Sequence, residues 1–298
     1  MKKVLLSTLV SSLLLTNLAL ADSNKTLTSK EVCDSATKVE TTKAKNSQVK
    51  LVKEALSSLE LTHKALINLN NNKIDKAKKN IELSLGKLDS ILALKNSPKF
   101  LPIENQIVVK NFEGTADDVE KVLDTVKKLL SDGKVQEAGE LLITLQSEID
   151  VTVVSLPLVS YPDALKLANK YLLENKKEEA KKVLTLALNS FAQENHVVPI
   201  PLVNTVELVK VASTVAKENK DLALKYLTSA HDELKKAEKL GYISSSTTTY
   251  KALHKLIDGV EKEVKGPNKA EKLFKELTES LKEFKSKIFS GDDKNSTK

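Results

Sequence analysis

The strongest constraint on the fold is a short pattern, a turn followed by a helix, that recurs four times along the chain. Each copy has Asn or Gly, then Lys, and then an alanine a few residues later; the alanines are Ala77, Ala138, Ala180 and Ala223. Asn and Gly tolerate the left-handed conformation that often ends a helix. Apolar residues on both sides of each turn recur every three or four positions, so each copy is predicted to be a helical hairpin.

Other local signals place the ends of helices. Thr115 followed by Asp118 three residues later is a variant of the capping box, which starts a helix. Gly241 follows a helical run and is expected to end it. Two more helices, over 248–264 and 268–289, are predicted after this glycine.

The segments between hairpins carry aliphatic–proline–aliphatic triplets at 101–103, 156–158 and 200–202. Proline lacks an amide hydrogen and disfavours helix before it, so these connectors are predicted to be short and extended. The predicted fold is therefore all-α, with stacked antiparallel helical hairpins in one domain over 49–289. Nearby β-branched runs leave a small sheet open, and whether hairpin 49–95 forms a subunit of its own also stays open.

Residues 1–21 have the pattern of a secretory signal, with a basic start, an apolar run and Ala19-Leu20-Ala21. Cleavage is expected after Ala21, which implies a periplasmic protein, and no later segment has the ~20 apolar residues of a membrane helix. Polar residues 22–48 and 290–298 are expected to be disordered tails. Within the first tail, Cys33 is a candidate for an intermolecular disulfide, with an incidental thiol as the alternative.

The charged residues exclude some partners and suggest a response to acid. The 47 basic residues are all lysine, against 40 acidic residues, for a net charge of +7. Without arginine there is no bidentate guanidinium fork, and no basic segment is interleaved with aromatics, so no nucleic-acid partner is expected. The lysines alternate with acids as on solvated helix faces. Protonation of the carboxylates would leave the chain strongly positive, and self-repulsion would then loosen its packing.

The sequence contains no pattern typical of catalysis. His63, His196, His231 and His254 lie outside any zinc or nucleophile motif, and there is no glycine-rich phosphate loop. We therefore predict no catalytic, cofactor-binding or metal-binding residue, and no enzyme. Five tyrosines are candidates for lining a groove between hairpins that holds a ligand or partner, with ordinary half-buried helix residues as the alternative: Tyr161, Tyr171, Tyr226, Tyr242 and Tyr250.

Several of these motifs occur together between Val153 and Tyr242. They are Leu156-Pro157-Leu158, the Asn175-Lys176 turn with Glu179-Ala180, Val198-Pro199-Ile200-Pro201-Leu202, and Ala237-Glu238-Lys239-Leu240-Gly241-Tyr242, with Gly133-Lys134-Val135-Gln136-Glu137-Ala138 before them. In this order the chain resembles the YfdX family of exported bacterial proteins, over roughly 110 to 290. The resemblance implies a mainly helical periplasmic protein that oligomerises and is linked to acid or multidrug stress. It carries over no catalytic residues.

Two functions follow as hypotheses. The first is a non-enzymatic, stress-associated periplasmic protein that binds other proteins in a chaperone-like or scaffold role under acid stress. The alternative is a periplasmic protein that binds a small ligand in a pocket between helical hairpins. Neither hypothesis requires a cofactor, and both are compatible with a homo-oligomer.

Overall fold

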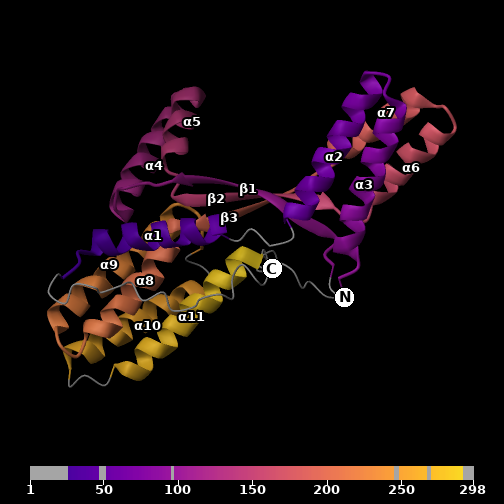
Figure 1. Cartoon of the computed structure of the whole chain (residues 1–298). Coiled ribbons are helices and arrows are strands. Elements are labelled where there is room, and N and C mark those ends of the chain that lie inside the picture. The colour runs from indigo at the N-terminus through magenta and orange to yellow at the C-terminus, as the bar shows by residue number, and fades with distance from the viewer. Residues whose placement is uncertain (1–25, 47–51, 95–96, 245–247, 267–269, 291–298) are drawn as a thin grey trace. The chain divides into compact units, whose positions relative to one another are not determined.

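The computed structural model describes residues 26–46, 52–94, 97–244, 248–266 and 270–290 (Figure 1). These residues form eleven helices and three strands. Signal segment 1–21 and tail residues 291–298 lie outside the described residues. The chain divides into two compact units, and the boundary between them falls inside all three strands.

Unit 2 takes residues Lys45–Gln106 and Val151–His196. It contains two of the predicted hairpins, α2(Val52–Asn70) with α3(Ile74–Leu92), and α6(Tyr161–Leu173) with α7(Lys177–Leu188). Helix α2 packs on α7 and α3 packs on α6, so the two hairpins enclose one apolar core. Hairpin 49–95 therefore shares its core with the hairpin of α6 and α7. The single domain predicted over 49–289 runs across the division into units, and its boundaries stay a prediction.

Unit 1 takes residues within Met1–Ala44, Ile107–Asp150 and Val197–Lys298. Its helices are α1(Ser29–Asn46), α4(Ala116–Ser131), α5(Val135–Thr144), α8(Ile200–Val215), α9(Lys220–Lys239), α10(Thr248–Lys265) and α11(Glu271–Ser290). Helix α8 packs on α9 and α11, and α10 packs on α9 and α11. A second apolar core lies among α8 to α11, and Val32 of α1 joins it.

The turns of the first three hairpins are confirmed. Asn72, Gly133 and Asn175 have positive φ angles of 58°, 75° and 59°. The alanines that follow the turns are all buried, as a close approach of the two helices requires. Asn219 differs: its φ is −141°, and its side chain caps α9 by accepting a hydrogen bond from the backbone amide of Leu222. The fourth copy has one residue fewer, and its asparagine begins a helix instead of ending one.

The predicted start and stop signals are also found. Thr115 and Asp118 form a reciprocal capping box at the start of α4. Gly241 follows α9 with a φ of 84°, in the left-handed region that favours glycine.

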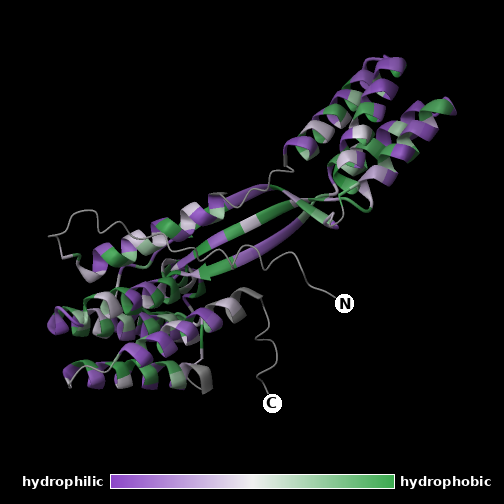
Figure 2. Cartoon of the chain, turned by 60° about the horizontal axis from the view of Figure 1, so that its bottom comes forward, coloured by the Kyte–Doolittle hydropathy of each residue, from purple (hydrophilic) through white to green (hydrophobic). Residues whose placement is uncertain are grey.

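The connectors correct the all-α prediction, because they form a sheet. Strands β1(Phe100–Lys110), β2(Glu148–Pro157) and β3(Ala192–Pro199) pair in the order β1-β2-β3. The amide of Leu158 donates to the carbonyl of Lys99, and the amide of Ile200 donates to that of Ser147, so neighbouring strands are antiparallel. Figure 2 shows the middle strand as the most apolar, in agreement with its buried residues.

The three proline triplets have different outcomes. Pro102 lies in β1 and Pro157 ends β2, as the extended prediction requires. Pro201 instead lies in the first turn of α8. The first amides of a helix have no intrahelical partner, so a proline costs nothing there.

The disordered tail predicted for 22–48 is wrong over Ser29–Asn46, which form α1. The helix begins with Thr28 and Glu31 bonded to each other's side chain and backbone, in a capping arrangement. Val32 and Ala36 are buried, at 0% and 6% exposure. Val32 and Ala36 lie one turn apart on a helix that is otherwise mostly Ser, Thr and Lys. Two small apolar residues are too few to give a detectable helical periodicity in the sequence.

Candidate functional site

The five tyrosines of the predicted groove divide between the two units. Tyr161 and Tyr171 belong to unit 2, and Tyr226, Tyr242 and Tyr250 belong to unit 1. Tyr161 is 1% exposed, in the core of unit 2, and burial raises the pKa of its hydroxyl to about 12. Tyr171 is half-buried, with the ammonium of Lys176 6.0 Å from its ring centroid. These positions do not bring the five side chains together within either unit, so the tyrosine groove stays a prediction.

Two tyrosines of unit 1 hold other segments in place. The Tyr242 hydroxyl accepts a hydrogen bond from the backbone amide of Ser147 (2.9 Å) and donates one to Glu148 (2.9 Å). Lys110 forms ion pairs with Glu148 and Asp150 beside it, so polar contacts join the end of α9 to β1 and β2. The Tyr226 hydroxyl donates to the carbonyl of Leu27 (2.5 Å), just before α1.

The histidines for which the sequence indicates no role include one close pair. The ring centroids of His231 on α9 and His254 on α10 lie 4.3 Å apart, and Tyr250 packs its edge on His254 at the same distance. Burial, and secondarily the neighbouring His231, lowers the pKa of His254 to about 4. Burial also lowers the pKa of His231, although Asp258, 3.8 Å away, opposes that shift. Burial therefore favours the neutral form of both rings.

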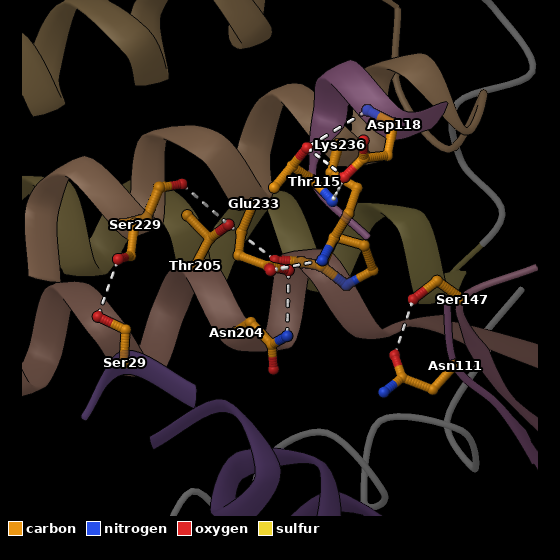
Figure 3. A network of polar contacts seen from close by, with 12 residues as sticks. Ser29, Asn111, Thr115, Asp118, Ser147, Asn204, Thr205, Ser229, Glu233 and Lys236 are labelled. Carbon is orange, nitrogen blue, oxygen red and sulfur yellow. Dashed lines mark hydrogen bonds and ion pairs between the residues drawn. The ribbon is translucent and has the colours of Figure 1, made fainter. Parts of the chain in front are cut away.

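A second polar cluster is buried between α8 and α9 (Figure 3). Lys236 and Glu233 form an ion pair at 2.5 Å with only 7% and 13% of their side chains exposed. The Asn204 amide nitrogen donates to the second Glu233 oxygen at 3.0 Å, while its own oxygen is buried with no hydrogen-bond partner among the described residues. Burial raises the pKa of Glu233, against the opposing effects of Lys236 and Asn204.

Sequence reasoning misses this cluster because Glu233 and Lys236, three positions apart, have the spacing of a solvated surface pair. The available signal lay in α8, whose residues from Ile200 to Leu208 are mostly apolar on all sides. A helix of that kind must be covered around its circumference, and α9 is one of the helices that cover it.

The first turns of helix α1 lie beside α9 (Figure 1). The carbonyl of Leu27 accepts a hydrogen bond from Tyr226, and the Ser229 hydroxyl donates to that of Ser29 at 2.8 Å. Cys33 is close enough to Glu233 for the carboxylate to raise the pKa of its thiol. In each of the three pairs, the two residues are 199 or 200 positions apart in sequence, so a later residue of α1 meets a later residue of α9. The two helices therefore run side by side in the same direction.

The predicted disulfide residue, Cys33, faces this contact. It is a free thiol, partly exposed, and burial followed by the Glu233 charge raises its pKa to about 12. A thiol of this kind is a poor nucleophile, because the thiolate is the reactive form. The intermolecular disulfide stays a prediction.

The hairpin of α4 and α5 in unit 1 carries several exposed apolar side chains. Ala138 is the buried residue of α5, which packs on α4, while four larger apolar side chains lie open to solvent. Their exposures are 49% for Leu130, 66% for Val135, 45% for Leu142 and 69% for Ile143. We call these four residues the hairpin patch. An exposed set of large apolar side chains on neighbouring positions is typical of a surface that contacts other proteins.

Neither a metal cluster nor a membrane span is found among the described residues. No group of three or more His, Cys, Asp or Glu side chains within them is arranged to hold a metal ion. None of the helices in the described part of the chain is long and apolar enough to cross a membrane.

The fold and these surfaces define a class: a mainly helical protein with a three-stranded sheet, buried polar clusters and an exposed apolar hairpin. The family model for YfdX protein matches residues 58–197, so the predicted resemblance to the YfdX family is confirmed over this segment. The match runs from α2 to β3, so it includes most of hairpin 49–95. The motifs after residue 197 that carried part of the resemblance lie outside it.

Among solved structures, the chain is similar to Salmonella Typhi YfdX. The two are 15% identical, with a TM-score of 0.34, over 49% of this chain and 91% of the other. No curated protein matches the chain.

Proposed function

We propose that this chain is a non-enzymatic periplasmic protein of the YfdX type that binds other proteins in a chaperone-like or scaffold role during acid stress. The observation that carries the proposal is the hairpin patch. Its four side chains are large, apolar and exposed, and they lie on two helices that pack on each other. Partly unfolded proteins expose apolar segments, and burial of such segments against a patch of this kind is favourable by roughly 25 cal/mol per Å².

The proposed location and trigger come from the sequence. Residues 1–21 have the pattern of a cleavable signal, which supports export to the periplasm. Their removal takes away Lys2 and Lys3, so 45 lysines then face 40 acids, a near balance that holds only while the carboxylates are ionised. In an acidic periplasm, protonation of carboxylates would leave both this protein and its partners with a large positive charge. The resulting self-repulsion would loosen their packing and expose apolar surfaces, which this protein could then bind.

The hairpin of α4 and α5 also favours self-association. Its charged residues are of mixed sign and pair locally, as Lys121 does with Asp118 and Lys127 with Asp124. Two copies that pack on each other through this hairpin would cover both patches. We therefore propose a homo-oligomer assembled through this hairpin. Light scattering on a sizing column should give a smaller particle for Ile143→Lys than for the unaltered protein, and an unchanged size would contradict this assembly.

The test of the main proposal is the aggregation of a client protein. Reduced insulin at pH 7 and a heat-denatured enzyme at about pH 5 are mixed with the mature chain, and light scattering is followed. The chain is expected to suppress aggregation at a near-equal molar ratio. If no suppression occurs at either pH and no client co-elutes, the proposed function is wrong.

A pair of matched variants tests the surface. Val135→Lys/Ile143→Lys places charges on two side chains that are 66% and 69% exposed, so the fold should tolerate them. Leu173→Lys/Leu186→Lys makes the same change at residues 67% and 70% exposed, on α6 and α7. Suppression should fall in the first variant and persist in the second. Equal suppression by both variants would remove the hairpin patch as the binding surface.

A further inference from the structure

We infer that α1 is a detachable strap, and that the groove it covers on α8 and α9 is a second binding site, for an amphipathic helix of a client protein. The inference rests on the proposed protein-binding function and extends it to a surface that is closed in this structure. Three observations support it: the weak apolar anchoring of α1, the polar groups beneath it, and the register of its contacts.

The anchoring of α1 is slight compared with that of its neighbours. It buries two apolar side chains, Val32 and Ala36, and most of its other positions are Ser, Thr, Lys or Glu. Helix α11, at the opposite end of the described chain, buries Phe274, Leu277, Leu281 and Phe284. Apolar burial supplies most of the stability of a docked helix, so α1 should detach well before α11 does.

The groove beneath α1 keeps an unmet polar group. The free oxygen of Asn204 belongs to a side chain that is 5% exposed, and Figure 3 shows it turned toward the side on which α1 lies. Helix α1 brings the hydroxyl of Ser29 and the thiol of Cys33 to this face, but neither bonds to Asn204 among the described contacts. A hydrogen-bond donor from another helix would satisfy the oxygen that α1 leaves unpaired.

The register of α1 defines what fits the groove. Ser29, Val32, Cys33 and Ala36 fall at positions i, i+3, i+4 and i+7, one face of a helix. All four side chains are small; Ser29 bonds to Ser229 of α9, Cys33 lies near Glu233, and Val32 joins the apolar core of unit 1. The groove therefore accepts a helix with small apolar and hydroxyl side chains on one face, running parallel to α9. This is helix-in-groove recognition, with the chain's own α1 as the resting occupant.

The test locks the strap with a reversible bond. Ser29 and Ser229 have hydroxyl oxygens 2.8 Å apart, so cysteines at these positions are close enough to form a disulfide. The variant Ser29→Cys/Ser229→Cys/Cys33→Ser in the full chain has one possible internal bridge, and its reduced form is the matched control. The probe is a fluorescent synthetic peptide with the sequence of residues 26–46, and its binding is measured by anisotropy.

The reduced protein should bind the peptide, and oxidation should weaken binding at least about tenfold. The reason is that the apparent affinity is proportional to the fraction of protein in which α1 is detached. Val32→Asp, which places a charge in the core contact of α1, should strengthen binding relative to the unaltered chain. Equal binding to oxidised and reduced protein, or no binding even to Val32→Asp, would overturn the strap. Circular dichroism confirms that each variant is folded.

Hydrogen exchange on the unaltered chain provides a test that needs no variant. Amides of α1 should exchange faster than those of α9, through an opening smaller than global unfolding. Equal protection of the two helices would overturn the inference. A client aggregation assay on the oxidised and reduced forms distinguishes a failure of the strap from a failure of the proposed function. Equal suppression of aggregation by both forms would mean that the strap is wrong and the function stands. No suppression by either form would mean that the proposed function is wrong.

Discussion

Replacement of His254 by glutamine should make the protein more resistant to mild acid. In the folded chain the ring of His254 lies between His231 of α9 and Tyr250 of its own helix, and its Nε2 atom is buried with no hydrogen-bond partner among the described residues. Asp258 favours the charged ring, while His231 and Lys235 oppose it. Because burial outweighs these charges, the pKa of His254 is lowered from 6.5 to about 4.

The sign and size of the effect follow from proton linkage. A histidine with a lowered folded pKa is favoured neutral, so its contribution to stability is fully present above about pH 6.5 and is lost as the pH falls toward 4. A shift from 6.5 to about 4 corresponds to a loss of roughly 2.5 kcal/mol between pH 7 and pH 4.5. The ring is only half-buried, and screening by solvent reduces the expected loss to about 1 kcal/mol.

The assay is urea unfolding followed by far-ultraviolet circular dichroism at pH 7 and pH 4.5. His254→Gln should lose about 1 kcal/mol less than the unaltered protein between these two pH values. The matched control is His63→Gln, the same replacement at an exposed histidine on α2. If His254→Gln and His63→Gln lose the same stability as the unaltered chain, the buried histidine pair does not contribute to acid sensitivity and the reasoning is refuted.

Three further predictions concern single contacts. Cys33, with a pKa of about 12 in place of 9.0, should react with a thiol reagent at pH 8 roughly 10³-fold more slowly in the folded chain than in urea, and equal rates would contradict its burial. Lys236→Met should cost about 3–5 kcal/mol of unfolding free energy at pH 7 because it leaves the Glu233 carboxylate buried without a counter-charge, whereas Glu233→Gln/Lys236→Met should cost less; a double variant that costs more than Lys236→Met would show that the two charges are not coupled. Asn175→Ala should cost about 1 kcal/mol because the residue holds a φ of 59°, and Asn175→Gly should cost little; thermal melts that place both variants together would contradict this account of the turn.

Much of the helical architecture could be predicted from local rules. The Asn and Gly turns, the buried alanines after them and the capping box at Thr115 each depend on a few residues close together in sequence. The sheet could be predicted only as a possibility, because its pairing joins strands that are separated by a whole helical hairpin. Proline triplets indicate that helix stops, but they do not indicate which extended segments pair.

The buried polar groups could not be predicted, since their burial depends on distant segments. Glu233 and Lys236 have the spacing of a surface pair, and they are enclosed because α8 packs on α9 and α1 lies along it. His231 and His254 come from different helices, with ordinary polar neighbours in sequence, and their close approach requires the packing of α10 on α9. The same reason explains the error at α1, where contacts with residues of the distant α9 stabilise a helix of low apolar content.

These buried groups also determine which part of unit 1 responds to acid first. A histidine that is held neutral begins to cost stability near its unfolded pKa of about 6.5, whereas ordinary carboxylates take up protons only near pH 4, so the contact of α9 with α10 weakens before the surface acids are neutralised. Glu233 acts with the opposite sign: its folded pKa is raised above 4.5, so the folded chain takes up this proton more readily than the unfolded chain, and acid favours folding at that site. Mild acid should therefore loosen α10 before it loosens the groove under α1. Hydrogen exchange measured at pH 7 and pH 5 should show that the amides of α10 lose protection at the lower pH, while those of α9 beside Glu233 keep it. If the amides of α1 lose protection first, the carboxylate of Glu233, and not its neutral form, holds the strap closed.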